Sequence, residues 1–178
     1  MSLLNVTSLE KAIETHTQPS DILNATRQII IERLKKDGSA EGGKDGMDAS
    51  LTVYDFKNKK LSIAAANNPV WIVRGTETIE IKPDKMPIGK HDRDSVSFTQ
   101  QEVDLKSGDV IYTLTDGFPD QFGGVSGKKF MIKRLREFIA ANAHLSMAEQ
   151  KQLLENTFAN WVGNIEQVDD VCLIGVRV

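Results

Sequence analysis

Val110-Ile-Tyr-Thr-Leu-Thr-Asp116-Gly117 is the stretch on which the fold depends. Its β-branched and aromatic residues predict a strand, and the Asp-Gly pair ends that strand in a turn. A second acidic step, Val168-Asp169-Asp170-Val171, opens the apolar run that closes the chain. Carboxylates at neighbouring strand ends are the oxygen ligands that Mg²⁺ and Mn²⁺ prefer. The sequence therefore predicts that Asp116 and Asp169 lie close together and share a cation site.

Composition and length are those of one ordinary globular domain. The chain has 178 residues, of which 40% are hydrophobic and 26% charged, as in typical soluble domains. A net charge of -3 argues against a general nucleic-acid binder, which needs a basic surface. The single cysteine, Cys172, cannot form an internal disulfide, and no apolar run is long enough to cross a bilayer. These features predict a cytoplasmic protein that does not insert into membranes.

Hydrophobic periodicity predicts an α+β layout. Helical spacing at 3–13 and 21–36 is followed by a series of extended segments with short polar turns between them, which favours antiparallel pairing. Helices are predicted again from Met131 and after Ser146, where Ser146 and Glu149 form a capping box. We expect the last strand, 170–178, to join the sheet centrally. The intervening strands are predicted at 48–56, 61–66, 71–74, 78–82, 95–105 and 110–114, with core candidates Leu51, Val53, Leu61 and Ile63.

Two other segments admit a structural and a functional interpretation. The segment 37–46 has four glycines and no large apolar residue, which predicts a mobile loop. A phosphate-binding P-loop would need a Lys-Ser/Thr ending, which is absent. The helix after Gly127 carries a basic face, which is either an ordinary solvated surface or a surface that attracts phosphopeptides. Its members are Lys128, Lys129, Lys133, Arg134 and Arg136.

A set of short motifs carries a family resemblance across essentially the whole chain. In order they are Gly46-Met-Asp48, Ala65-Ala-Asn-Asn-Pro69, Pro87-Ile-Gly89, Thr115-Asp-Gly-Phe-Pro-Asp-Gln-Phe-Gly-Gly124 and Gln167-Val-Asp-Asp-Val171. In order and spacing they resemble the SpoIIE-like bacterial branch of the metal-dependent (PPM, type-2C) serine/threonine protein phosphatases. The resemblance implies a single domain over 1–178. It also implies an antiparallel β-sandwich flanked by α-helices, the α-β-β-α arrangement of that family.

The resemblance also implies a chemistry. Family members hold Mg²⁺ or Mn²⁺ ions that activate a water for attack on a phosphoserine or phosphothreonine, so that no side chain serves as nucleophile. Carried over by match, Asp116 and Asp169 are metal ligands. Asp170, Asp48, Gly117 and Asn67 take possible metal-binding or supporting places. The implied partner is a phosphorylated protein substrate or a signalling protein.

The chain departs from the family at its beginning. The family's Gly-Asp-Phe/Tyr and Asp-x-x-Gly-His-Gly segments, which supply further metal ligands, have no counterpart in these residues. We therefore expect an N-terminally truncated domain that binds Mn²⁺ or Mg²⁺ weakly and has weak or no activity. An incomplete sheet also exposes an edge, which predicts self-association. The alternative function is a non-catalytic phosphatase-fold module that binds a signalling partner.

Overall fold

The computed structural model describes residues 2–36 and 46–178. Most of the segment expected to be a loop, 37–45, lies outside the described residues. The chain divides into two compact units. Unit 1 comprises Met1–Pro69 and Lys82–Leu105, and unit 2 comprises Val70–Ile81 and Lys106–Val178. Helices and antiparallel strands occur in both, which confirms the predicted α+β class.

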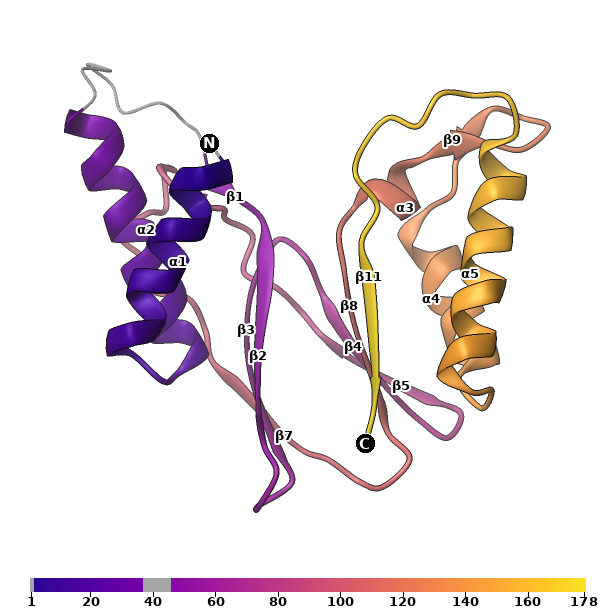
Figure 1. Cartoon of the computed structure of the whole chain (residues 1–178), viewed down its shortest axis with the longest axis horizontal. Coiled ribbons are helices and arrows are strands. Elements are labelled where there is room, and N and C mark those ends of the chain that lie inside the picture. The colour runs from indigo at the N-terminus through magenta and orange to yellow at the C-terminus, as the bar shows by residue number, and fades with distance from the viewer. Residues whose placement is uncertain (1, 37–45) are drawn as a thin grey trace. The chain divides into compact units, whose positions relative to one another are not determined.

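Unit 1 packs a pair of helices on a small sheet. Helices α1 (Ser2–Thr15) and α2 (Pro19–Lys36) lie side by side (Figure 1). Strands β2 (Ala49–Asp55), β3 (Lys60–Ala66) and β7 (Gln101–Asp104) form an antiparallel sheet in the order β2-β3-β7. The short strands β1 (Gly46–Met47) and β6 (Ile88–Gly89) pair separately. The apolar core of unit 1 consists of Leu23, Ile30, Ala64, Ala66, Met86, Ile88 and Phe98.

Arg27 holds α2 to the irregular segment that precedes β7. Its side chain is 2% exposed, donates to the carbonyl of Val96 at 2.7 Å and lies 4.7 Å over the ring of Phe98. Burial lowers the pKa of its guanidinium, against the raising effect of Asp94 and Asp84. The sequence pattern alone gave no sign of this buried cation, because charged residues are almost never fully buried.

Unit 2 contains the stretch that opens the sequence analysis. Strands β4 (Val70–Arg74), β5 (Glu77–Ile81), β8 (Val110–Leu114) and β11 (Leu173–Arg177) form an antiparallel sheet in the order β11-β8-β4-β5. Helices α4 (Ile132–Asn142) and α5 (Met147–Val162) pack against the apolar cluster of this unit. Both tryptophans belong to unit 2: Trp71 is fully buried in β4, whereas Trp161 near the end of α5 is partly buried.

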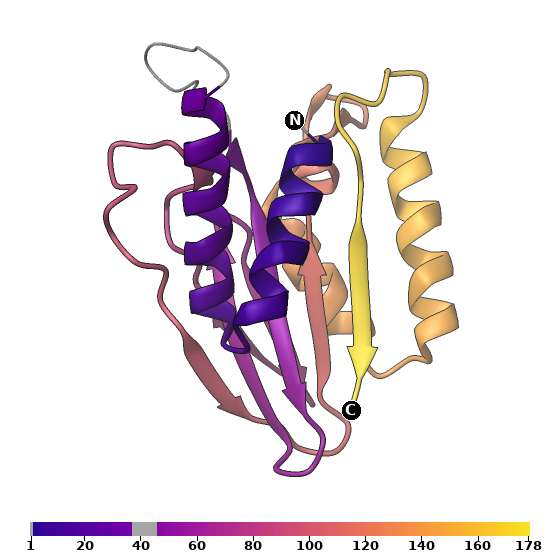
Figure 2. The same cartoon turned by 60° about the vertical axis from the view of Figure 1, so that its left-hand side comes forward.

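The structure corrects several local predictions. β11 is at the edge of its sheet, not at its centre, and pairs with β8 alone among the described strands. Figure 2 shows the two strands side by side, with β11 in yellow. Val53 is 39% exposed and is not a core residue, whereas Leu61 and Ile63 are buried as predicted. Of the expected strand 95–105, only Gln101–Asp104 forms a strand in the structure. The predicted loop after Asp116 contains the short helix α3 (Gly117–Asp120) and the strand β9 (Phe122–Gly123), which pairs with β10 (Lys128–Lys129).

The capping box at the start of α5 is confirmed. The Ser146 hydroxyl accepts from the backbone N–H of Glu149, and the Glu149 carboxylate accepts from the backbone N–H of Ser146 at 2.9 Å. The Ser146 hydroxyl also donates to the Glu149 carboxylate at 2.7 Å, and this bond, together with that from the Ser146 N–H, lowers the pKa of Glu149. We expect Ser146→Ala to lower the free energy of unfolding of unit 2 by about 1 kcal/mol, because helix N–H groups lose their acceptor. Urea denaturation measures the loss, and Ser126→Ala, at an exposed position between β9 and β10, is the control that should leave the midpoint unchanged.

Candidate functional site

The turn that carries Asp116 is fixed against the segment that enters β11. Asp116 is the N-cap residue of α3, with an exposed side chain that makes no capping hydrogen bond. The Thr115 backbone N–H donates to the carbonyl of Cys172 at 2.9 Å, and the Thr115 hydroxyl donates to the carbonyl of Asp170 at 3.0 Å. The backbone N–H of Cys172 in turn donates to the Thr115 hydroxyl at 3.0 Å. The β8–β11 pairing is thus extended past the end of the ladder by a side chain.

Gly117 allows the closest approach in this turn. A Cβ at this position would overlap the carbonyl oxygen of Asp170, and would lie 2.9 Å from its carbonyl carbon and 3.3 Å from a methyl group of Val171. A side chain here would therefore push the two backbones apart. The Asp-Gly step puts the backbone next to Asp116 in contact with the second acidic motif.

The acidic motif itself lies in an exposed loop. Asp169 and Asp170 are both exposed, and the Asp169 carboxylate accepts from the backbone N–H of Asp170 at 2.7 Å. Gln121 anchors this loop: its amide donates to the carbonyl of Glu166 at 3.0 Å and its oxygen accepts from the N–H of Val168 at 3.2 Å. Gln121 is 0% exposed. It stands within one of the quoted motifs, but the sequence assigned it no role.

Asp48 and Asn67 form a separate polar pair within unit 1. The Asn67 amide donates to the Asp48 carboxylate at 2.8 Å, and Asn67 has a positive φ of 60°. Asp84 fixes the same turn, since its carbonyl accepts from the N–H of Asn67 at 3.0 Å and its own N–H donates to Ala65. The structure therefore brings three of the motifs together, since Gly46–Met47 also pairs with Ile88–Gly89. A metal-binding place for Asp48 or Asn67 stays a prediction.

The side chains available as metal ligands limit which metal site the described residues can form. Within residues 2–36 and 46–178, no group of three or more His, Cys, Asp and Glu side chains is arranged to hold a metal ion. A hard divalent cation takes about six oxygen ligands, and a two-ion centre needs several carboxylates. The described residues therefore do not fit a two-ion centre. A metal-binding place for the exposed carboxylates at the Asp116 turn and the 169–170 loop stays a prediction.

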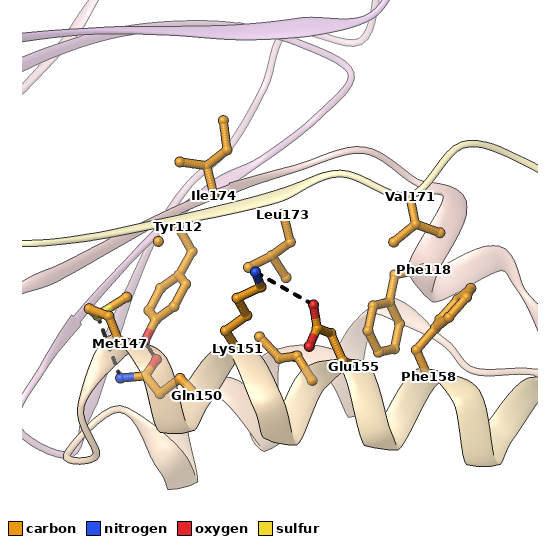
Figure 3. A pocket seen from close by; sticks show the side chains of 12 residues that line it. Tyr112, Phe118, Met147, Gln150, Lys151, Glu155, Phe158, Val171, Leu173 and Ile174 are labelled. Carbon is orange, nitrogen blue, oxygen red and sulfur yellow. Dashed lines mark hydrogen bonds and ion pairs between the residues drawn. The ribbon is translucent and has the colours of Figure 1, made fainter.

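A cavity of about 530 Å³ lies between α5 and the β8–β11 edge of unit 2. Figure 3 shows side chains from α5 directed toward β11 across this space. Its floor is apolar and aromatic, with Phe118 and Phe158 in an edge-to-face contact at 4.9 Å. The buried hydroxyl of Tyr112 donates to Gln150, and burial raises the pKa of this tyrosine. Lys151 and Glu155 form an exposed ion pair at 3.8 Å in its lining.

The five basic residues predicted on one helix face are divided in the structure: Lys128 and Lys129 form β10, and only Lys133, Arg134 and Arg136 belong to α4. Most of them have a partner. Lys129 contacts Asp120 at 2.8 Å, and Arg136 contacts Glu80 at 2.9 Å. Arg134 lies 4.5 Å over the ring of Trp161. These partners offset much of the positive charge, which favours the solvated-surface interpretation over attraction of phosphopeptides.

The fold and these motifs define the chain as a protein phosphatase domain of the bacterial type-2C class. It belongs to the stage II sporulation protein E (SpoIIE) family, whose model matches residues 1–178. Among curated protein sequences, none matches the chain. No helix in the described ranges is both long and apolar enough to cross a membrane.

Solved phosphatase domains have the same fold. The SiaA-PP2C domain of Pseudomonas aeruginosa matches with a TM-score of 0.88 and 29% identity, over 99% of this chain and 68% of that one. A structure of the SpoIIE phosphatase domain with part of its regulatory domain, from Bacillus subtilis, matches with a TM-score of 0.69 and 16% identity, over 97% of this chain and 49% of that one. The Mn-presoaked SpoIIE phosphatase domain of the same organism gives 0.59 and 16%, over 98% and 73%. The chain thus spans about half to three quarters of these relatives.

Proposed function

We propose that the chain binds a single Mg²⁺ or Mn²⁺ weakly at the Asp116 turn and hydrolyses phosphate esters weakly or not at all. The observation that carries the proposal is the backbone contact between Gly117 and Asp170, which places the two acidic motifs against each other. Asp116 and Asp169 are the proposed ligands, with about one or two oxygens each and water completing the shell. Asp170 and Gly117 have supporting roles at this turn, while a metal-binding or supporting place for Asp48 and Asn67, which belong to unit 1, stays a separate prediction. The soaking of the Bacillus subtilis relative with Mn supports the choice of metal.

The proposed substrate is a phosphoserine or phosphothreonine protein in a cytoplasmic signalling system. The family assignment supports a protein substrate. The exposed Cys172 thiol suits a reducing compartment.

A magnesium titration followed by NMR tests the metal proposal without relying on turnover. We expect millimolar Mg²⁺ to shift amides at 115–120 and 168–171 in fast exchange, because ligands of one ion sense its binding together. Asp116→Asn should abolish these shifts, since the amide replaces a charged ligand by a neutral one. Asp120→Asn is the matched control, because that carboxylate belongs to the same turn but pairs with Lys129. Shifts that survive Asp116→Asn would place the ion elsewhere.

Turnover of p-nitrophenyl phosphate tests the activity. We expect a rate close to that of the uncatalysed reaction in millimolar Mn²⁺, because the described residues do not fit a two-ion centre. Robust turnover that is lost in Asp116→Asn would contradict the proposal of weak activity but would support Asp116 as part of the site.

A non-catalytic partner-binding module is the second candidate function. The lack of a group of three metal-binding side chains among the described residues favours it. Binding of a signalling protein that persists in EDTA and in Asp116→Asn would separate it from a metal-dependent phosphatase.

A further inference from the structure

The loop that carries Asp169 is attached to the rest of unit 2 at two places. This loop joins α5 to β11 and is drawn in yellow in Figure 1. On one side, the hydroxyl of Thr115 forms hydrogen bonds with the backbone of residues 170 and 172. On the other side, the side-chain amide of Gln121 forms hydrogen bonds with the backbone of residues 166 and 168. Asp169 lies between the two attachments, so the backbone that bears its exposed carboxylate is held from both directions.

The surroundings of the Gln121 side chain require an amide. Its N–H groups donate to the carbonyls of Phe122 and Glu166, each at 3.0 Å, and its oxygen accepts from the N–H of Val168 at 3.2 Å. A carboxylate has no donor for the two carbonyls, and a methionine offers only a weakly accepting sulfur. Because the side chain is 0% exposed, losing these bonds leaves buried polar groups unpaired, which costs more than the bonds contribute.

The backbone of Gln121 joins the same point to two helices of unit 2. Its N–H donates to the carbonyl of Phe118 in α3 at 3.3 Å, and its carbonyl accepts from the indole N–H of Trp161 in α5 at 2.9 Å. Two residues further on, Gly123 lies so close to α5 that an added Cβ would overlap the carbonyl oxygen of Trp161. Gln121 is therefore supported by α3 and α5, and its side chain passes the position of that support to the loop.

We propose that Gln121 is the positioning residue that sets where the Asp169 carboxylate lies relative to the Asp116 turn. Asp116 is the N-cap of α3 and Gln121 is its C-cap, so this one short helix connects the turn to the residue that holds the loop. The role rests on the proposed function in one respect, since it takes Asp116 and Asp169 as ligands of the same ion. The hold of Gln121 on the loop does not depend on a metal.

Amide hydrogen exchange of Gln121→Met tests the hold on the loop without metal. Methionine has a similar length and keeps the packing, but the three side-chain hydrogen bonds are lost. We expect the N–H of Val168 to exchange at least about tenfold faster, while the N–H of Cys172, which donates to Thr115, keeps its wild-type rate. Equal acceleration of both amides, which indicates general loosening of unit 2, or an unchanged rate at Val168 overturns the proposal.

Gln121→Glu gives a pH signature that a packing role alone does not produce. Burial favours the neutral carboxylic acid, which can donate to one carbonyl and accept from Val168 as the amide does. The ionised carboxylate has no donor, so we expect the loop to be held at about pH 5 and released at about pH 8. Chemical shifts of residues 166–168 measure the change against wild type, whose amide does not titrate. Shifts that stay constant over this range, in a variant that circular dichroism shows to be folded, overturn the proposal.

The wild-type protein supplies a measurement that needs no substitution. The side-chain amide protons of Gln121 are buried and hydrogen-bonded, whereas Gln152 on α5 donates to Asn156 at an exposed position. We expect the Gln121 amide protons to exchange with water at least about tenfold more slowly than those of Gln152. Equal rates would show that the Gln121 amide is not held between the carbonyls and would overturn the proposal.

A Mg²⁺ titration followed by NMR connects the hold on the loop to the metal. In Gln121→Met the midpoint at amides 115–117 should rise at least about threefold, because Asp169 is no longer held beside the turn. Gln152→Met, at an exposed position of α5, is the matched control and should keep the wild-type midpoint. An unchanged midpoint in Gln121→Met, with the loop released, overturns the positioning role and keeps the proposed function. A wild type that does not respond to Mg²⁺ refutes the metal proposal instead, and the exchange rates then decide whether Gln121 holds the loop.

Discussion

Gly117→Ala is expected to destabilise unit 2 by about 3 kcal/mol, at the upper end of the usual effect of overpacking. The added methyl group would overlap the carbonyl oxygen of Asp170 and lie 2.9 Å from the carbonyl carbon. Both obstacles are backbone atoms held by the hydrogen bonds of Thr115, so no side-chain rotation relieves the contact. The turn of Asp116 and the 170–172 segment must move apart.

Urea denaturation and amide chemical shifts measure these effects. The midpoint should fall, and amides at 115–117 and 170–172 should shift even without metal. Gly127→Ala is the matched control: Gly127 has a φ of 59° with no atom within 4 Å of an added Cβ, so only backbone strain of about 1 kcal/mol is expected. Equal losses in the two variants, or unchanged shifts at 170–172, would contradict the close backbone contact.

Asp109→Asn should also cost unit 2 about 2 kcal/mol, because it removes the buried charge that accepts hydrogen bonds from Arg74. The Asp109 side chain is 1% exposed and receives a hydrogen bond from Arg74 at 2.7 Å. The Asp109 carboxylate also accepts a hydrogen bond from the backbone N–H of Lys106 at 2.8 Å. Its own carbonyl accepts from the N–H of Val178, so the residue also fastens the end of β11.

The effect of this substitution should depend on pH in a defined direction. Burial raises the pKa of Asp109, but the hydrogen bonds from Arg74 and Lys106 outweigh burial and hold it below its usual value. A lowered folded-state pKa contributes stability above the unfolded value of about 3.9, and that contribution is lost as the pH falls through the folded pKa. The difference between wild type and Asp109→Asn should therefore be constant from pH 8 to pH 5 and should shrink below about pH 4.

Asp92→Asn provides the control, because Asp92 is exposed and the change should stay within about 0.5 kcal/mol at each pH. Urea midpoints of the three proteins between pH 3 and pH 8 make the comparison. A difference between wild type and Asp109→Asn that grows on acidification would show that the carboxylate is not stabilised in its charged form.

Local signals in the sequence predicted most of the elements. The helix predicted at 21–36 is α2, Pro19–Lys36, and the capping box at Ser146 begins α5. The strands of the predicted hairpins begin and end within one or two residues of the predicted bounds. These features follow from periodicity and turn chemistry, which act over a few residues and can be read directly.

The errors concern tertiary pairing and packing. The position of β11 at a sheet edge depends on which distant strands pair, and an apolar run is the same in the middle of a sheet as at its edge. Val53 is two positions from Leu51, so both are expected on the same face of the strand. Leu51 packs against the core cluster of unit 1, whereas Val53 is exposed. Arg27 is buried through partners some 60 to 70 positions away in sequence.

The candidate site divides in the same way. The motifs predicted that the Asp116 turn meets the 169–170 segment, and the backbone contacts of Thr115 and Gly117 agree with that prediction. A shared ion between Asp116 and Asp169 stays a prediction. Gln121 was missed as the anchor of the acidic loop, because its role depends on burial and on carbonyl groups that no residue type encodes.

The distribution of tryptophan has a spectroscopic consequence. Trp71 and Trp161 are the only tryptophans of the chain, and both belong to unit 2. Intrinsic fluorescence excited at the red edge of tryptophan absorption therefore follows unit 2, while unit 1 unfolds without a tryptophan signal of its own. Far-ultraviolet circular dichroism, by contrast, includes α1 and α2 of unit 1. Fluorescence and dichroism curves that separate would reveal two cooperative steps, and curves that coincide would reveal one.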